Sequence, residues 1–205
     1  LNTVGNTLIP VVLFKGEDPA RASNFGNGFF GLGYVLTPLL FTQLLKVMSF
    51  SMTLSIFGIL VFIFLLFALV SAYPQVPTDF KLSTAFKVLG KAAVLIAALS
   101  LFCYMSLETT MGTWIKPLMT EIYGKGAGAA ANAGIILSLF GVAMMTGRFL
   151  ASRIKNLTDI GARFLLILSL AALAAIVVLI MTNNPVFAVI AVIIIGLAFA
   201  PIFPT

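Results

Sequence analysis

One acidic residue, Glu108, lies inside a long apolar stretch in which a charge is costly. Residues 92–107 before it carry no charge, and the stretch continues to about Trp114. A carboxylate at the centre of a membrane helix costs about 2.5–3.5 kcal/mol, so such acids are usually proton relays, ion sites or acceptors for a substrate. Tyr104 lies four residues earlier, on the same helical face. We expect both in a substrate or ion pathway. Alternatively, Glu108 lies in contact with water near the outer interface.

Polar and small residues also recur along one face of two other apolar stretches. The first holds Asn2, Thr3, Asn6, Thr7 and Pro10; the second holds Asn24, Asn27, Gly31, Tyr34 and Pro38. Polar groups at membrane depth need partners in protein or water, and small residues let helices approach closely. Asn2, Asn6, Asn24 and Asn27 are therefore candidates for a cavity wall. The alternatives are plain helix packing and, for the first stretch, a position in the membrane interface.

Trp114, Arg148 and Arg153 lie at the ends of apolar stretches. Trp114 is a candidate for stacking on a sugar ring, although an anchor in the interfacial aromatic belt is the commoner role. Arg148 and Arg153, in the segment 147–154, are candidates for clamping a gate through helix-end carbonyls or an acid. Ordinary flanking of a membrane span by basic residues explains them as well, and the two roles are compatible.

The composition excludes most classes of protein. Of 205 residues, 61% are hydrophobic and only 9% are charged, too few charges to cover the surface of a soluble domain and too much hydrophobicity for disorder. The chain has no His and one Cys, so no disulfide, zinc or haem site, or His-based acid–base pair can form within it. We expect no cofactor, no metal and no enzymatic activity, and we expect Cys103 to pack in a core.

The charge-free stretches predict an all-α polytopic membrane protein, since a span needs about 20 residues. Residues 1–14 are read as the tail of one span, so that the chain is expected to be part of a longer one. Thr182–Pro185 divides the charge-free run 164–205 into two spans. Six spans follow the tail: 22–45, 47–78 (ending near Tyr73), 92 to about 114, 126–147, 164 to about 181, and 185–205.

Basic residues are distributed unequally between the two ends of the spans. Nine fall at one end and three (Lys46, Lys116, Lys125) at the other; the nine are Lys15, Arg21, Lys81, Lys87, Lys91, Arg148, Arg153, Lys155 and Arg163. The end with nine is predicted to be cytoplasmic. These basic residues occur one by one at the ends of spans and do not cluster, which indicates a lipid bilayer, not nucleic acid, as the partner. The cytoplasmic segment 74–91 is predicted to be a surface helix or a linker.

Four segments resemble the Major Facilitator Superfamily, most closely its fucose–proton symporter group. They are Asn24–Leu40 (NFGNGFFGLGYVLTPLL), Ser106–Ile115 (SLETTMGTWI), Thr146–Ile154 (TGRFLASRI) and Gly196–Thr205 (GLAFAPIFPT). The resemblance implies an incomplete fold of that superfamily, a partial helix plus six transmembrane helices from two bundles, from the end of the fourth helix to the tenth. Residues 1–73 would belong to the N-terminal bundle, 74–91 to the central linker and 92–205 to the C-terminal bundle.

The resemblance implies a plasma-membrane transporter, monomeric, with a sugar-like substrate at midplane and alternating access. It places Asn24, Asn27, Glu108 and the polar residues of 1–14 along the cavity. Proton-coupled members often carry an acid on the fourth helix, where this chain has Asn2, while the motif's asparagine is matched by Asn6. If a proton drives transport, Glu108 or an acid outside this chain must carry it; sodium coupling and uncoupled facilitation are alternatives.

Three classes of function compete. The first is a transporter for a sugar or related polyol, favoured because we find no Arg or Lys in mid-span to hold an anion; a carrier for another solute is its variant. The second is a seven-helix receptor, but a retinal protein needs a lysine in its last span and none follows Lys155. The third, an intramembrane enzyme, lacks a catalytic pair.

Overall fold

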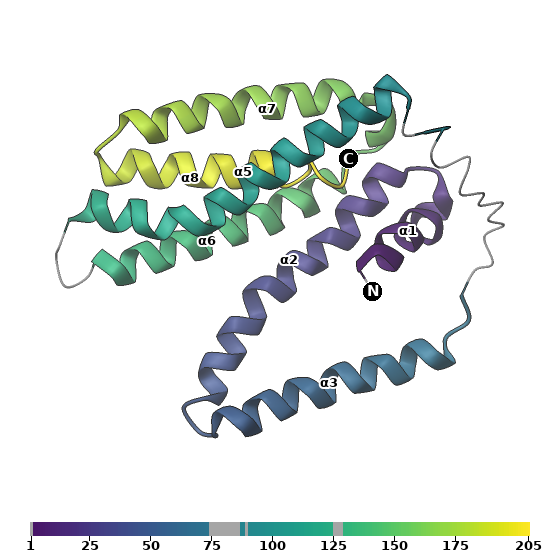
Figure 1. Cartoon of the computed structure of the whole chain (residues 1–205), viewed down its shortest axis with the longest axis horizontal. Coiled ribbons are helices and arrows are strands. Elements are labelled where there is room, and N and C mark those ends of the chain that lie inside the picture. Colours follow the sequence, from purple (N-terminus) through teal and green to yellow (C-terminus); the bar gives the residue numbers. More distant parts are fainter. Residues whose placement is uncertain (1, 74–86, 89, 125–128) are drawn as a thin grey trace.

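The structure, a computed structural model, describes residues 2–73, 87–88, 90–124 and 129–205, and their regular elements are helices (Figure 1). A 3₁₀ turn, Leu13–Gly16, follows the first helix. The α-helices are α1 (Asn2–Val12), α2 (Pro19–Leu44), α3 (Phe50–Val70), α5 (Ala92–Tyr123), α6 (Ala129–Ala151), α7 (Leu157–Met181) and α8 (Pro185–Phe199). The expected all-α fold class is therefore confirmed.

The predicted division at Thr182–Pro185 is confirmed, because α7 ends at Met181 and α8 begins at Pro185. The Asn184 side chain accepts a hydrogen bond from the Val186 N–H, and Pro185 occupies the first helical position, where its missing N–H costs nothing. The end of α5 is not where we expected it. The helix continues past Trp114 and contains Pro117, so Glu108 lies near the middle of its 32 residues.

Among the described residues, four helices are long and apolar enough to cross a membrane: α3, α5, α6 (residues Asn132–Ala151) and α7. The apolar α8 has 15 residues and spans about 22 Å at 1.5 Å per residue, after which turns continue the chain to Pro204. The 26-residue α2 is less uniformly apolar, because polar and small residues interrupt it. Because several helices are long and apolar enough to cross a membrane, the chain is a multi-pass membrane protein.

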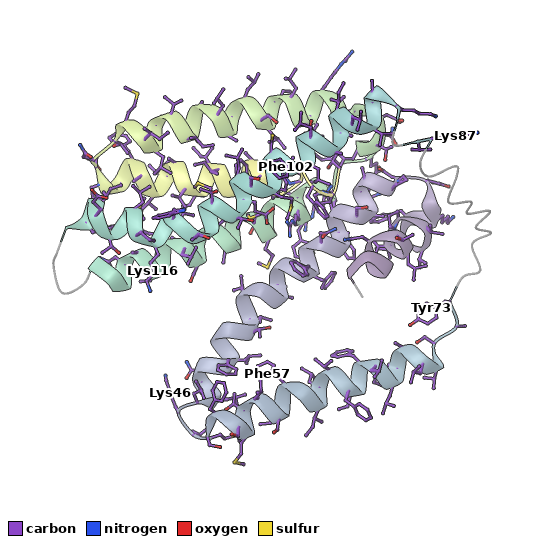
Figure 2. All side chains as sticks on the ribbon, in the orientation of Figure 1. Lys46, Phe57, Tyr73, Lys87, Phe102 and Lys116 are labelled. Carbon is purple, nitrogen blue, oxygen red and sulfur yellow. The ribbon has the colours of Figure 1, made fainter. Side chains whose placement is uncertain are left out.

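The core lies between α5, α6, α7 and α8 (Figure 1). Its most deeply buried side chains include Ile115, Met119, Val192 and Ile195. The N-terminal half of α2 packs along α6, while α3 stands away from the bundle and exposes Phe62, Phe64 and Phe67. Phe57, near the start of α3, packs against Phe41 of α2, with 5.8 Å between the ring centroids (Figure 2). Cys103, expected in a core, is exposed on α5, because its helical face turns away from the bundle.

One end of the bundle gathers the α1–α2 turn, the α6–α7 turn and the C-terminal residues (Figure 1). We call it the closed end, because α2 contacts α6 and α7 there. Six of the nine basic residues of the predicted cytoplasmic side lie in the two turns or within seven residues of them on the adjoining helices: Lys15, Arg21, Arg148, Arg153, Lys155 and Arg163. The predicted surface helix in 74–91 lies outside the described residues except for 87, 88, 90 and 91.

Gly147 allows α6 and α8 to approach closely. A Cβ at this position would lie 2.6 Å from the Ala200 Cβ and 2.8 Å from the Leu197 carbonyl oxygen. We expect Gly147→Ala to destabilise the protein by about 1–3 kcal/mol, because backbone must shift. Gly58→Ala in α3, where a Cβ would meet nothing within 4 Å, is the matched control and should cause no loss. Thermal unfolding in detergent measures both; equal melting temperatures would contradict the packing.

Candidate functional site

A cavity of about 380 Å³ lies between α2, α5 and α6. Its polar side chains come mainly from α5, and apolar side chains of α2 and α6 complete the wall. The lining residues are Phe30, Gly31, Met105, Glu108, Thr109, Gly112, Thr113, Leu137, Phe140, Gly141, Met144 and Arg148. This volume lies within the range of small-molecule sites, about 300–1,000 Å³.

Glu108 and Arg148 form an ion pair in this cavity, with 3.9 Å between Oε1 and Nη2. The side chain of Glu108 is 27% exposed and that of Arg148 is 7% exposed. Arg148 also donates from Nε to the Ala200 carbonyl (3.1 Å) and from Nη1 to the Asn27 carbonyl (3.3 Å). One guanidinium, on α6, thus connects the acid on α5 with α2 and with the end of α8.

Arg148 lies in the last turn of α6 and so is not a mid-span cation, yet its side chain lines the cavity. The sequence suggests a flanking residue at this position, but the side chain points into the protein. The reason is local, because a long side chain reaches far from its own Cα, and here the carbonyl and carboxylate acceptors lie on the protein side.

Tyr104 lies one turn before Glu108 and is buried, with its ring 5.8 Å from that of Phe199, edge to face. Its hydroxyl has no hydrogen-bond partner within the described part of the chain. A buried unsatisfied hydroxyl costs about 1–3 kcal/mol, so this group is available to a water molecule or a solute. The structure therefore brings Tyr104, Glu108 and Arg148 together.

The asparagines predicted to line a cavity lie instead in helix contacts at the closed end. Asn24 is fully buried and donates from Nδ2 to the Ala20 carbonyl (2.9 Å) and to Thr205 Oγ1 (2.8 Å). Asn27 donates to Asn6 Oδ1 (3.2 Å) and to the Ser23 carbonyl (2.9 Å). Neither lines the cavity described above. The side chains of Asn2, Tyr34 and Pro38 lie outside the described residues.

Trp114 and Arg153 lie away from Glu108. Trp114 is 62% exposed and borders a separate, open groove on α5 with Ser106 and Thr110. Arg153 is exposed in the α6–α7 turn, and no side-chain contact links it to the described part of the gate. Of the two arginines predicted to act at a gate, Arg148 is the one for which the described part of the chain shows side-chain contacts to other helices.

Asp18 and Arg21, which sequence reasoning missed, connect α2 to both ends of the α6–α7 turn. The Asp18 carboxylate accepts from the N–H groups of Leu157 (3.0 Å) and Thr158 (3.2 Å) and from the Thr158 hydroxyl (2.7 Å). Arg21 Nε donates to the Ser152 carbonyl (2.7 Å). An anion at the start of α7 and a cation at the end of α6 complement both helix dipoles. We call these five residues the latch.

The surroundings of Asp18 keep the latch charged. Burial raises the pKa of this carboxyl, but hydrogen bonds from the Thr158 hydroxyl and from the N–H groups of Arg21, Leu157 and Thr158 outweigh it and hold the pKa below its ordinary 3.8. Because the pKa is lowered, the latch's stabilisation is present above that ordinary value and is lost as the pH falls through the lowered one. The latch is therefore fully formed at neutral pH.

We expect Asp18→Asn to loosen the closed end, because the negative charge at the start of α7 disappears and the amide offers one acceptor oxygen where the carboxylate uses two. Ala20 packs against Ala151 and Leu157, so Ala20→Cys in a Cys103→Ser background reports the separation. Its alkylation rate should rise about fivefold in Asp18→Asn. Glu17→Gln, an exposed neighbour with the same loss of charge, should leave the rate unchanged; an equal rise in both would contradict the latch.

The fold and the site define a class: a multi-pass helical membrane protein with a charged cavity whose wall connects to a closed end. The family model of the Major Facilitator Superfamily matches residues 2–205. The chain therefore belongs to this superfamily of secondary transporters, which are not enzymes. Searches of curated proteins and of solved structures gave no match.

Proposed function

We propose that this protein moves a sugar or a related small, neutral, hydroxylated solute across the plasma membrane by alternating access, coupled to protons. The observation that carries the proposal is the ion pair of Glu108 and Arg148, which joins the cavity to the closed end. Membership of the superfamily supports transport in general. The fucose-symporter resemblance supports the sugar, the plasma membrane and a monomeric state.

The chemistry of the cavity favours a neutral solute. Glu108 supplies a hydrogen-bond acceptor, Thr109 and Thr113 supply hydroxyls, and Phe30 and Phe140 supply apolar ring surface. The charge of Arg148 is already matched by Glu108 and by two carbonyl oxygens. An anionic solute would have to displace these acceptors, whereas the hydroxyls of a polyol can donate to Glu108 without leaving a charge unpaired.

The same contacts support proton coupling. A protonated Glu108 carries no charge and no longer attracts Arg148. The Arg148 guanidinium is then positioned by fewer contacts, so its hydrogen bond to the Asn27 carbonyl becomes weaker. Loss of this hydrogen bond weakens the contact between α2 and α6. We therefore assign Glu108 and Tyr104 to the substrate and proton pathway and Arg148 to the gate. Asn6, Asn24 and Asn27 would border the pathway when the closed end separates.

Uptake by the intact protein in proteoliposomes tests the proposal. A labelled panel should include hexoses, a polyol, an amino acid and an organic anion, each with and without an inward proton gradient. We expect accumulation of one sugar or polyol that depends on the gradient. Gradient-driven uptake of the anion alone would overturn the substrate class. Uptake that ignores the gradient, or that follows a sodium gradient, would overturn proton coupling.

A further inference from the structure

An apolar groove lies between α6, α7 and α8 near the closed end. It holds about 320 Å³, and every residue that lines it is apolar, among them Leu150, Ile154, Phe164, Leu168, Ile194 and Leu197. It is distinct from the Glu108 cavity, which α2 and α5 help to form. A groove without a hydrogen-bonding side chain fits a hydrocarbon chain better than a polar solute.

The surface beside this groove is apolar and exposed. Leu166, Ile167 and Leu170, on the same helix as Phe164 and Leu168, are 61%, 65% and 58% exposed. In a helix apolar enough to cross a membrane, such side chains contact acyl chains. Lipid acyl chains therefore match both the groove and the surface beside it.

Three basic residues, which we call the rim, adjoin lining residues of the groove in the sequence. Arg153 and Lys155 flank the groove residue Ile154, and Arg163 precedes the groove residue Phe164. All three are exposed, and the ion pair found among the described residues involves only Glu108 and Arg148. Asp159, in the first turn of α7, forms no ion pair with them. Arg163 lies about 9 Å along α7 from its start at Leu157.

We propose that this groove binds one anionic phospholipid, with an acyl chain between α6, α7 and α8 and its phosphate among Arg153, Lys155 and Arg163. The partner is chosen by charge complementarity, since basic pockets between membrane helices bind anionic headgroups. The site holds the α6–α7 turn, to which the latch is attached, so an occupied groove stabilises the closed end.

Native mass spectrometry of the purified protein tests the site. Equal amounts of dioleoyl-phosphatidylglycerol and dioleoyl-phosphatidylcholine are added in a non-ionic detergent. We expect one preferred phosphatidylglycerol adduct, weakened about fivefold by Arg163→Gln and further by adding Arg153→Gln and Lys155→Gln. Ala171→Phe, which fills the groove and keeps the rim, should weaken the same adduct. Inorganic phosphate, which lacks an acyl chain, should not compete.

The matched control removes Lys46 and Lys116, which lie at the other end of the helices from the α6–α7 turn (Figure 2). Lys46→Gln with Lys116→Gln should leave the adduct unchanged. Equal binding of the two lipids, equal loss in rim and control variants, or competition by inorganic phosphate would each overturn the proposal. If the triple variant does not fold, Arg163→Gln and Ala171→Phe still decide, because both positions are exposed.

Discussion

Glu108→Gln is expected to abolish accumulation of solute against its gradient, because glutamine cannot bind and release a proton. Solute counterflow, which needs only binding and alternating access, should survive. A hydrogen bond to a charged acceptor contributes about 1.5–3 kcal/mol, so the solute affinity should fall about 10- to 100-fold. Counterflow and gradient-driven uptake measured in the same proteoliposomes separate the two effects.

Glu121→Gln is the matched control for this result. Glu121 lies on the same helix, is exposed, and lies outside the cavity. Its variant should transport like the unaltered protein. Unchanged gradient-driven accumulation in Glu108→Gln would remove this acid from the coupling path, and loss of both accumulation and counterflow would point to a structural role.

Arg148→Gln is expected to have the largest effect on stability. The change leaves the Glu108 carboxylate without its cation and weakens the contacts to the Ala200 and Asn27 carbonyls. Breaking a fully buried pair costs about 3–5 kcal/mol. Because Glu108 is 27% exposed and solvent screens it, we expect about 2–3 kcal/mol instead. Thermal unfolding in detergent measures this loss.

The double variant Glu108→Gln with Arg148→Gln separates the ion pair from the other contacts of Arg148. Removal of both charges leaves no unpaired carboxylate, so the double variant should be more stable than the sum of the two single effects, by about 0.5–3 kcal/mol. Additive effects would show that the two charges do not interact. This result would contradict the proposed connection between the cavity and the closed end.

The helices were largely predictable because their signals are local. Charges mark most boundaries, and the Asn184–Pro185 pair marks the start of α8 through a cap and a missing N–H. The exception is the end of α5, where Lys116 and Pro117 suggest a boundary but the helix continues to Tyr123. A single proline removes one backbone hydrogen bond, and its neighbours on a packed helix tolerate the loss.

The site was predictable only in part. Glu108 stands out because an acid in an apolar stretch needs a reason, and its neighbour on the same face, Tyr104, follows from helical spacing. Asp18 carries a weaker signal, an acid before a proline at a helix start, and its partners Leu157 and Thr158 are about 140 residues away. Arg148 was recognised as a gate candidate, but its contact with Glu108 depends on packing.

The distance between the α1–α2 turn and the α6–α7 turn tests the central claim, that these segments form a gate of a transporter. Spin labels at Glu17→Cys and Lys155→Cys, both exposed, in a Cys103→Ser background report it by double electron–electron resonance. The account predicts a short distance at neutral pH that gains a second, longer population when the transported solute and protons are added to the intact protein in liposomes. A single distance that stays the same under every condition would contradict it.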